Sequence, residues 1–182
     1  MKKILAILLS LAFLLSIQTV SLAQKSYGNL YDPETNAADD IEALIVQAKK
    51  EKKHIILQVG GNWCGWCYLF HDFIEANNEV KEIADQNYLT YHLNHSQDNK
   101  NLDLLNKYSH PERFGFPVLL ILNSEGILVH TQNSALLEEG KGYNVKKVKE
   151  FFTGWTPTAL DPASYKEKQE KQEEQEEKEE KD

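Results

Sequence analysis

The stretch Gly60-Gly61-Asn62-Trp63-Cys64-Gly65-Trp66-Cys67 contains the two cysteines of the chain, with two residues between them. An apolar run, His54 to Val59, leads into it and is rich in β-branched side chains, which predicts a buried strand. A helix is expected to begin near Cys67. The two cysteines therefore fall on a turn from a strand to a helix, where their spacing lets the two sulfur atoms meet in a small ring.

A Cys-x-x-Cys pair on such a turn favours thiol–disulfide chemistry. The start of a helix directs unpaired N–H groups and the positive end of the helix dipole at the first sulfur, so we expect Cys64 to ionise readily. The thiolate is the attacking species in disulfide exchange, which makes Cys64 the candidate nucleophile. Cys67, one turn into the helix, is placed to resolve a mixed disulfide formed at Cys64.

Three other interpretations of the pair stay open at this point: a structural disulfide, half of a metal site, or two buried thiols. A disulfide across so short a loop removes little chain entropy, so it would stabilise a domain weakly. Zinc sites usually need four ligands, and the sequence has no second Cys-x-x-Cys and no His-x3-His cluster. His71, four residues after Cys67, would complete only a weak Cys/Cys/His set.

The N-terminus has the parts of an export signal. Lys2 and Lys3 form a basic start, residues 4–17 are almost wholly apolar, and Ser21-Leu22-Ala23 matches the small-x-small cleavage pattern. We expect a signal peptide over residues 1–23, cleaved after Ala23, with no stable membrane insertion afterwards. The apolar run is short for a membrane span; a retained anchor is the alternative. Export would place both cysteines in an oxidising compartment, periplasmic or otherwise extracytoplasmic, where disulfide exchange is needed.

Charge and composition argue against nucleic-acid binding. The chain has a net charge of −8, and cleavage after Ala23 would remove Lys2 and Lys3 and make it −10. An acidic chain lacks the positive surface that phosphate backbones require. Residues 166–182 carry five Lys against eight Glu and one Asp. We expect this tail to be solvated, either disordered or weakly helical through Glu–Lys pairs at i,i+4 spacing, and not a coiled coil.

Hydrophobic periodicity predicts an alternation of helices and strands after residue 36. Apolar residues at helical spacing indicate helices, and alternating or continuous apolar runs indicate strands. The expected helices cover residues 37–53, capped by Asn36 or Thr35, then 67–76, 79–86, 102–108 and 145–154, the last capped by Asn144; the expected strands cover 54–59, 88–93, 118–122 and 127–131. A turn at residues 123–126 would join the last two strands into a hairpin.

This order of elements, with the residues around the cysteines, resembles the thioredoxin family. Trp63-Cys64-Gly65-Trp66-Cys67 is similar to the thioredoxin signature, whose middle residues are usually Gly-Pro. Phe116-Pro117 resembles the cis-proline site that faces the cysteines in that fold. The similarity runs from His54 to Trp155. The export signal, the cysteine motif and a helix break at Asn77-Asn78 make the chain most similar to exported bacterial thioredoxin-like proteins, related to the C-terminal domain of the transmembrane disulfide reductase.

The resemblance implies a thiol–disulfide oxidoreductase with an α/β, thioredoxin-like fold, in which a central mixed sheet is flanked by helices. It makes Cys64 the nucleophile and Cys67 the resolving thiol, with no cofactor beyond a redox-active Cys64–Cys67 disulfide. Pro117, if cis, would present the backbone of Phe116 to an extended substrate segment. The implied substrate-binding residues are Trp63, Trp66, Phe116 and Pro117, and the implied modulating residues are Gly65 and Gln58.

Two positions depart from the family pattern. Thioredoxins usually carry a buried Asp six residues before the first cysteine, as a proton acceptor for the second, and here that position is Gln58, which cannot titrate. Proton transfer from Cys67 would then need water or another group, such as Glu75 or a histidine. Trp66 replaces the proline between the cysteines, and we expect it either to contact the substrate or to pack on the loop.

The chain is thus expected to hold four segments: a signal peptide (1–23), a lead-in segment (24–36), a thioredoxin-like domain (37–160) and a charged low-complexity tail (161–182). The expected partners are thiols and disulfides of exported proteins and an upstream membrane reductase or oxidase, in cell redox homeostasis. The alternative function is a non-catalytic binding or copper-handling module of the same fold, because copper(I) suits a dithiol. For the histidines we expect surface or hydrogen-bonded roles: His54, His71, His92, His95, His110 and His130.

Overall fold

The computed structural model describes residues 29–166, 169–170 and 175 of the 182-residue chain. The predicted signal peptide with its cleavage point after Ala23, and most of the charged tail, lie outside the described residues. Within the described part of the chain, no helix has the length and apolar character that crossing a membrane requires.

A mixed four-stranded sheet forms the centre of the domain, as the sequence predicts. Its strands lie in the order β2-β1-β3-β4. They are β1 (His54–Gly60), β2 (Tyr88–Asn94), β3 (Val118–Leu122) and β4 (Leu128–Asn133). β1 is parallel to β2 and antiparallel to β3, and β3 and β4 form an antiparallel pair. In this register Gln58 lies between His92 of β2 and Leu119 of β3, in the middle of the sheet.

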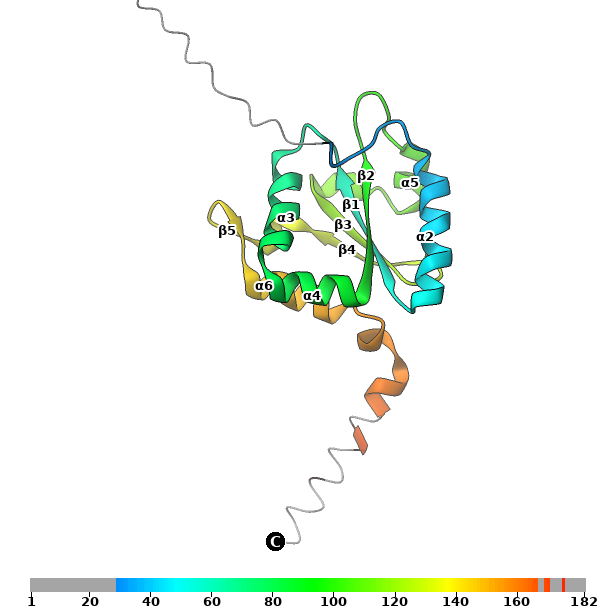
Figure 1. Cartoon of the computed structure of the whole chain (residues 1–182), viewed down its shortest axis with the longest axis vertical. Helices are drawn as coiled ribbons and strands as arrows, with labels where there is room; N and C mark the ends of the chain where they lie inside the picture. The colour runs from blue at the N-terminus through cyan, green and yellow to red at the C-terminus, as the bar shows by residue number, and fades with distance from the viewer. Residues whose placement is uncertain (1–28, 167–168, 171–174, 176–182) are drawn as a thin grey trace, which may run out of the picture.

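Helices cover both faces of the sheet (Figure 1). They are α2 (Ala37–Glu51), α3 (Gly65–Ala76), α4 (Asn78–Asn87), α5 (Leu102–Lys107) and α6 (Val145–Gly154). Every residue of β1 is buried, because helices pack on its two sides. Ile55, Leu57 and Val59 share a core with α2 and α5, whereas Ile56 shares one with α3, α4 and α6. Gln58 follows Ile56 at strand spacing and therefore faces α3.

Side-chain caps set the helix boundaries. Asn36 accepts the N–H of Ala38 and Asn144 accepts the N–H of Lys147, which confirms both predicted caps. The expected start of α3 near Cys67 was too late: α3 begins at Gly65, because Cys64 itself is the N-cap. Asn77 has an extended backbone and separates α3 from α4, as predicted.

The segment between β4 and α6 is more ordered than its glycines suggested. It forms a 3₁₀ turn (Ser134–Leu137) and a short hairpin of β5 (Glu138–Glu139) and β6 (Gly142–Tyr143). Tyr143 of this hairpin packs on Phe70 of α3 with ring centroids 4.8 Å apart. The hairpin therefore supports the helix that carries the cysteines.

Two further 3₁₀ turns complete the described chain. One, Pro111–Phe114, precedes β3, and the other, Thr158–Leu160, follows α6. Residues 162–166, at the start of the predicted tail, are helical, and the hydroxyl of Tyr165 donates to the carbonyl of Ala159 at 2.7 Å. The chain thus keeps local order slightly past the predicted end of the domain at residue 160.

Candidate active site

Cys64 and Cys67 form a disulfide where the end of β1 turns into α3. The Cα atoms of the two residues are 5.3 Å apart, and the sulfurs are 2.02 Å apart. Cys64 is 5% exposed and Cys67 is fully buried. The lead-in segment crosses this same end of the domain on its way to α2 (Figure 1).

The sulfur of Cys64 occupies the N-cap position of α3. The backbone N–H of Cys67 donates to this sulfur at 3.2 Å. The carbonyl of Cys64 also accepts the N–H groups of Cys67 and Tyr68, which begins the helix at the next residue. The N–H of Cys67 and the positive end of a 12-residue helix therefore both face the first sulfur. Negative charge on the Cys64 sulfur would be stabilised by both.

A cis peptide bond joins Phe116 to Pro117. Phe116 is half-buried and packs against the cluster formed by the two cysteines and Tyr31. Its ring also meets the edge of Trp63 with centroids 5.2 Å apart, and it stacks on His95 at the same centroid distance. The proline loop and the cysteine turn are thus joined by aromatic contacts beside the disulfide.

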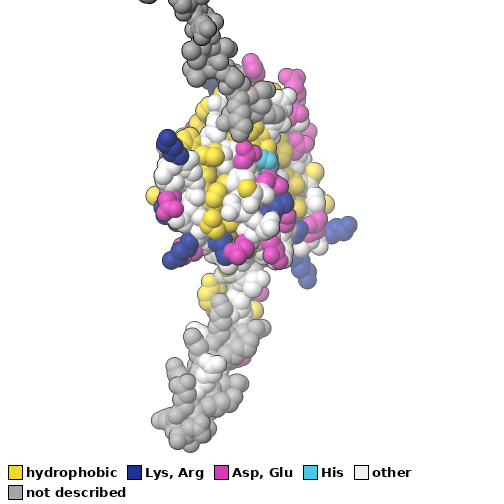
Figure 2. Space-filling view, turned by 60° about the vertical axis from the view of Figure 1, so that its left-hand side comes forward, with side chains coloured by type: hydrophobic (Ala, Val, Ile, Leu, Met, Phe, Trp, Pro, Cys, Tyr) yellow, Lys and Arg dark blue, Asp and Glu magenta, His cyan; other side chains and the backbone are white. Residues whose placement is uncertain are grey.

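The two tryptophans of the motif are each held at one edge and exposed elsewhere. Trp63 is 58% exposed, and its Nε1–H donates to the carbonyl of His95 at 2.8 Å. Trp66 is 37% exposed, and its ring packs edge-on against Tyr143 with centroids 5.7 Å apart. Trp66 therefore packs on the β6 hairpin at one edge, and its contact with a substrate stays a prediction. Figure 2 views the domain from the side on which α3 lies, and hydrophobic side chains form a patch on this face.

The two glycines next to the cysteines differ in the room around them. A Cβ at Gly60 would lie under 3.0 Å from both the Sγ of Cys67 and the hydroxyl oxygen of Tyr31. At Gly65, by contrast, no heavy atom lies within 4 Å of the position of a Cβ. Gly60 is therefore required by close packing, while Gly65 leaves open space beside the disulfide.

Gln58 lies directly behind the second cysteine. It is 2% exposed. Its Nε2 donates to the carbonyl of Cys67 at 3.0 Å and to the hydroxyl of Tyr31 at 2.8 Å. The amide that replaces the usual family carboxylate is therefore fully engaged, and it links β1 to the first turn of α3.

Tyr31 is the site residue that the sequence analysis missed. It lies in the polar lead-in segment, yet it is fully buried and clusters with both cysteines. Asn62 of the cysteine motif binds its backbone twice: Asn62 Oδ1 accepts the Tyr31 N–H at 3.0 Å, and Asn62 Nδ2 donates to the Tyr31 carbonyl at 2.7 Å. Tyr68 donates to the same Asn62 Oδ1 at 2.7 Å. A pair of apolar residues, Leu30-Tyr31, within a polar segment was the available signal.

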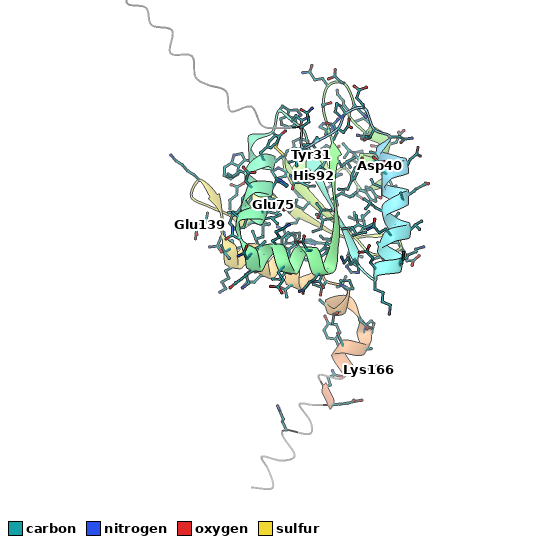
Figure 3. The ribbon with its side chains drawn as sticks, viewed as in Figure 1. Tyr31, Asp40, Glu75, His92, Glu139 and Lys166 are labelled. Carbon is teal, nitrogen blue, oxygen red and sulfur yellow. A yellow bond between two sulfur atoms is a disulfide. The ribbon has the colours of Figure 1, made fainter. Side chains whose placement is uncertain are left out.

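Glu75 and the histidines were suggested as proton acceptors for Cys67, and Figure 3 labels Glu75 and His92. The His92 ring lies against Tyr31 and His71, with centroids 5.4 and 5.5 Å apart. Burial, and then the neighbouring His71, lower the pKa of His92 to about 4. Glu75 is paired instead with Lys81 at 3.0 Å. These side chains share one cavity of about 130 Å³, whose lining includes Gln58, His71, Glu75 and His92.

The remaining histidines have structural partners. His54 contacts the carbonyl of Trp155 at 2.8 Å through its Nδ1, and His130 stacks on the ring of Trp155. His110 is paired with Glu112 at 3.3 Å. Among the residues that the structure describes, no group of three His, Cys, Asp or Glu side chains is arranged to hold a metal ion.

Comparison with known proteins identifies the fold. A family model described as a thioredoxin-like domain matches residues 41–139, more than half of the chain. The chain is similar to the solved disulphide isomerase from Xylella fastidiosa Temecula1, with 21% identity and a TM-score of 0.60, covering 69% of this chain and 95% of that one. It is also similar to the oxidised C-terminal domain of Neisseria meningitidis DsbD, with 18% identity and a TM-score of 0.48, covering 65% of this chain and 95% of that one. No curated protein matches the chain.

Proposed function

Because the chain belongs to the thioredoxin-like domain family, we propose that it is a thiol–disulfide oxidoreductase acting on exported proteins. One observation carries the proposal: Cys64 and Cys67 are disulfide-bonded, and the Cys64 sulfur caps α3 and accepts a backbone N–H. This placement favours the thiolate at the attacking position. The dithiol form of the pair carries the two electrons exchanged and the disulfide form accepts them, so the proposed reaction needs no separate cofactor.

The exchange proceeds in two displacements. In the reduced protein the Cys64 thiolate attacks one sulfur of a substrate disulfide, and the other substrate sulfur leaves as a thiolate that takes up a proton. Cys67 then loses its proton and attacks the Cys64 sulfur, which forms the Cys64–Cys67 disulfide and releases the second substrate thiol. The substrate disulfide is reduced and the protein dithiol is oxidised. The same steps in reverse transfer the disulfide to a substrate.

The substrate segment is proposed to lie across the cysteine turn beside the proline loop. Trp63 and Trp66 carry exposed ring surface on either side of the cysteine pair in the sequence, and Phe116, which precedes Pro117, packs against the cysteine cluster. Apolar and aromatic side chains of an unfolded or extended segment would pack on these rings.

The compartment and partners follow from the sequence. The signal pattern over residues 1–23 supports export to the periplasm or an equivalent space, where thiols are oxidised and disulfides form. A soluble dithiol spent on a substrate must be restored, so a membrane reductase or oxidase is proposed as the redox partner. The acidic net charge of −8 supports protein rather than nucleic-acid partners.

Turnover of a disulfide substrate tests the proposal. The chain from residue 24 onward should reduce insulin in the presence of a dithiol, Cys64→Ser should abolish turnover, and Cys67→Ser should accumulate mixed disulfides. Undiminished turnover by Cys64→Ser would sink the assignment of the nucleophile. Stoichiometric copper in the purified protein together with no insulin turnover would favour the alternative of a copper-handling module.

A further inference from the structure

We propose that the hydroxyl of Tyr31 donates a hydrogen bond to the sulfur of Cys67 when that sulfur attacks as a thiolate, and that Gln58 positions Tyr31 to do so. The inference rests on the proposed exchange function and adds a residue from the lead-in segment to its machinery. The pair Gln58 and Tyr31 would thus stand where thioredoxins usually carry a buried acid.

The first support is the place of the hydroxyl. Tyr31 and Cys67 are both fully buried and belong to one cluster. The hydroxyl oxygen of Tyr31 and the Sγ of Cys67 face the same small space above Gly60, because a Cβ there would lie under 3.0 Å from each. Opening of the disulfide frees the Cys67 side chain to turn about its Cα–Cβ bond within this space. The missing side chain of Gly60 therefore leaves room for the two atoms to approach each other.

The second support is the direction of the hydroxyl proton. The carbonyl of Cys67 can only accept a hydrogen bond, so the atom of Gln58 that faces it must be the donor, Nε2. The same Nε2 faces the Tyr31 oxygen at 2.8 Å, so that oxygen accepts from Gln58. The proton of Tyr31 must then point elsewhere. Within the described part of the chain, Gln58 is the only hydrogen-bond partner of this hydroxyl, which leaves its proton available for the sulfur.

The third support is the rigid attachment of Tyr31 to the cysteine turn. Asn62 makes two hydrogen bonds to the backbone of Tyr31, at 3.0 and 2.7 Å, and is itself only two residues before Cys64. The N–H of Leu30 is held by the hydroxyl of Tyr68 on α3 at 3.4 Å. The phenol is thus fixed relative to Cys67 by residues of the same turn and helix. A donor held in place costs little reorganisation when charge develops on its partner.

In this proposal Tyr31 donates a hydrogen bond to the Cys67 sulfur and does not act as a base. Burial raises the pKa of Tyr31 well above its ordinary value, so the phenol stays protonated at any working pH. In the second displacement Cys67 gives up its proton, its sulfur bonds to the Cys64 sulfur, and the Cys64–substrate bond breaks. The departing substrate thiolate takes up a proton, which balances the one lost by Cys67. A hydrogen bond from Tyr31 stabilises the charged form of Cys67 just before this attack.

The other titratable groups around the pair do not replace Tyr31. Cys64 is in the mixed disulfide at this stage and carries no charge. His92 on β2 meets the Tyr31 ring, and with its pKa lowered to about 4 it is neutral near pH 7. Tyr68 on α3 and Tyr143 on β6 also lie near enough to raise the pKa of Tyr31. Among the described residues, none of the side chains that shift the pKa of Tyr31 is an Asp, Glu, Lys or Arg.

A two-phase thiol assay separates the two displacements. When the reduced protein attacks 5,5′-dithiobis(2-nitrobenzoate), Cys64 releases the first coloured thiolate and Cys67 releases the second. We expect Tyr31→Phe to leave the first phase unchanged and to raise the apparent pKa of the second phase by about one unit. Because a more basic thiolate is also a better nucleophile, the second phase at pH 7 should slow by only about threefold.

Tyr88→Phe is the matched control. Tyr88 is also buried, but its hydroxyl donates to the carbonyl of Phe152 in α6, and both residues belong to a different core cluster from Tyr31 and Cys67. This variant should leave both phases as in the natural protein. Replacement of Tyr31 by 3,5-difluorotyrosine, a stronger donor of nearly the same size, should shift the second-phase pKa downward. A purely structural role predicts no such shift of opposite sign.

The outcomes separate this inference from the function on which it rests. If the natural protein releases no thiolate with either cysteine, the proposed function fails. If it shows both phases, but Tyr31→Phe and the difluoro variant keep its second-phase pKa, the role of Tyr31 is overturned. Should Tyr31→Phe fail to fold, the difluoro variant alone decides the outcome by the sign of its shift.

Discussion

The side-chain Nε2 of Gln58 lies 3.0 Å from the backbone carbonyl of Cys67, so the middle of the central sheet is hydrogen-bonded to the first turn of the helix that carries the cysteines. The same atom also binds Tyr31. One buried amide therefore joins three segments behind the second sulfur. A carboxylate at this position, as in most thioredoxins, could accept but not donate these bonds when ionised.

Gln58→Asp should make release of the substrate faster and the domain less stable. The carboxylate would supply a base for Cys67, and the natural protein should show a slow second displacement that rises with pH. At the same time the donor to the Cys67 carbonyl is lost, which should lower the free energy of unfolding by about 1–3 kcal/mol. Stopped-flow rates of the second phase and urea denaturation measure the two effects. Gln58→Asn, which shortens the side chain without adding a charge, should not accelerate release; equal acceleration by both variants would contradict the role of a base.

Gly60→Ala should destabilise the oxidised domain, whereas Gly65→Ala should not. A methyl group at Gly60 would overlap the Sγ of Cys67 and the Tyr31 hydroxyl, and one at Gly65 would meet no atom within 4 Å. Overpacking of this kind costs about 1–3 kcal/mol. Urea denaturation of both variants in the oxidised state makes the comparison. A loss of the same size at Gly65 would mean that the effect comes from the backbone and not from close packing.

The stability of the domain should fall between pH 6.5 and about 4 because of His92. Burial, and then His71, lower the pKa of His92 from 6.5 to about 4 in the folded chain. The unfolded chain therefore binds the proton first as the pH falls. The contribution of His92 is complete above pH 6.5 and is lost on the way to pH 4, with an upper limit of about 3 kcal/mol.

His92→Gln should flatten this part of the stability profile. His110→Gln is the control, because the His110 side chain is 63% exposed. Burial also lowers the pKa of His54, so a smaller slope of the same sign should remain in His92→Gln, whereas His110→Gln should keep the full slope. Urea midpoints at several pH values between 4 and 7 give the result. Parallel profiles for the natural protein and His92→Gln would show that His92 is not a source of the slope.

Deletion of residues 166–182 should change the melting temperature little. The deleted segment has no apolar residue and would leave Tyr165, with its hydrogen bond to Ala159, in place. Almost no apolar surface is therefore lost. Differential scanning calorimetry of the deleted and full chains should agree within about 4 °C, the shift expected for about 1 kcal/mol in a domain of this size. A larger drop would show that the tail packs on the domain.

Most of the fold could be predicted because it is specified by local patterns. The apolar run at residues 54–59 and the hairpin around residues 123–126 depend on neighbours in sequence, and so do the caps at Asn36 and Asn144. Helix and strand periodicity is a property of ten or so consecutive residues. The start of α3 was placed too late because a cysteine is an uncommon N-cap, and its capping bond becomes visible only with the backbone in place.

The sequence by itself determined the family, the order of the elements and the pair of sulfurs at a helix start, since each of these is written in contiguous residues. Only the tertiary structure decided what surrounds the second sulfur. Tyr31 meets Gln58 across 27 positions, and Tyr143 of the Glu138–Tyr143 hairpin meets Phe70 of α3 across 73. Such contacts arise from the path of a polar segment over the end of the sheet, and no periodicity encodes that path. The physical reason is that Tyr31 is buried by residues distant in sequence, at the end of the domain that holds the cysteines. Its own neighbours in sequence form a loop and predict exposure.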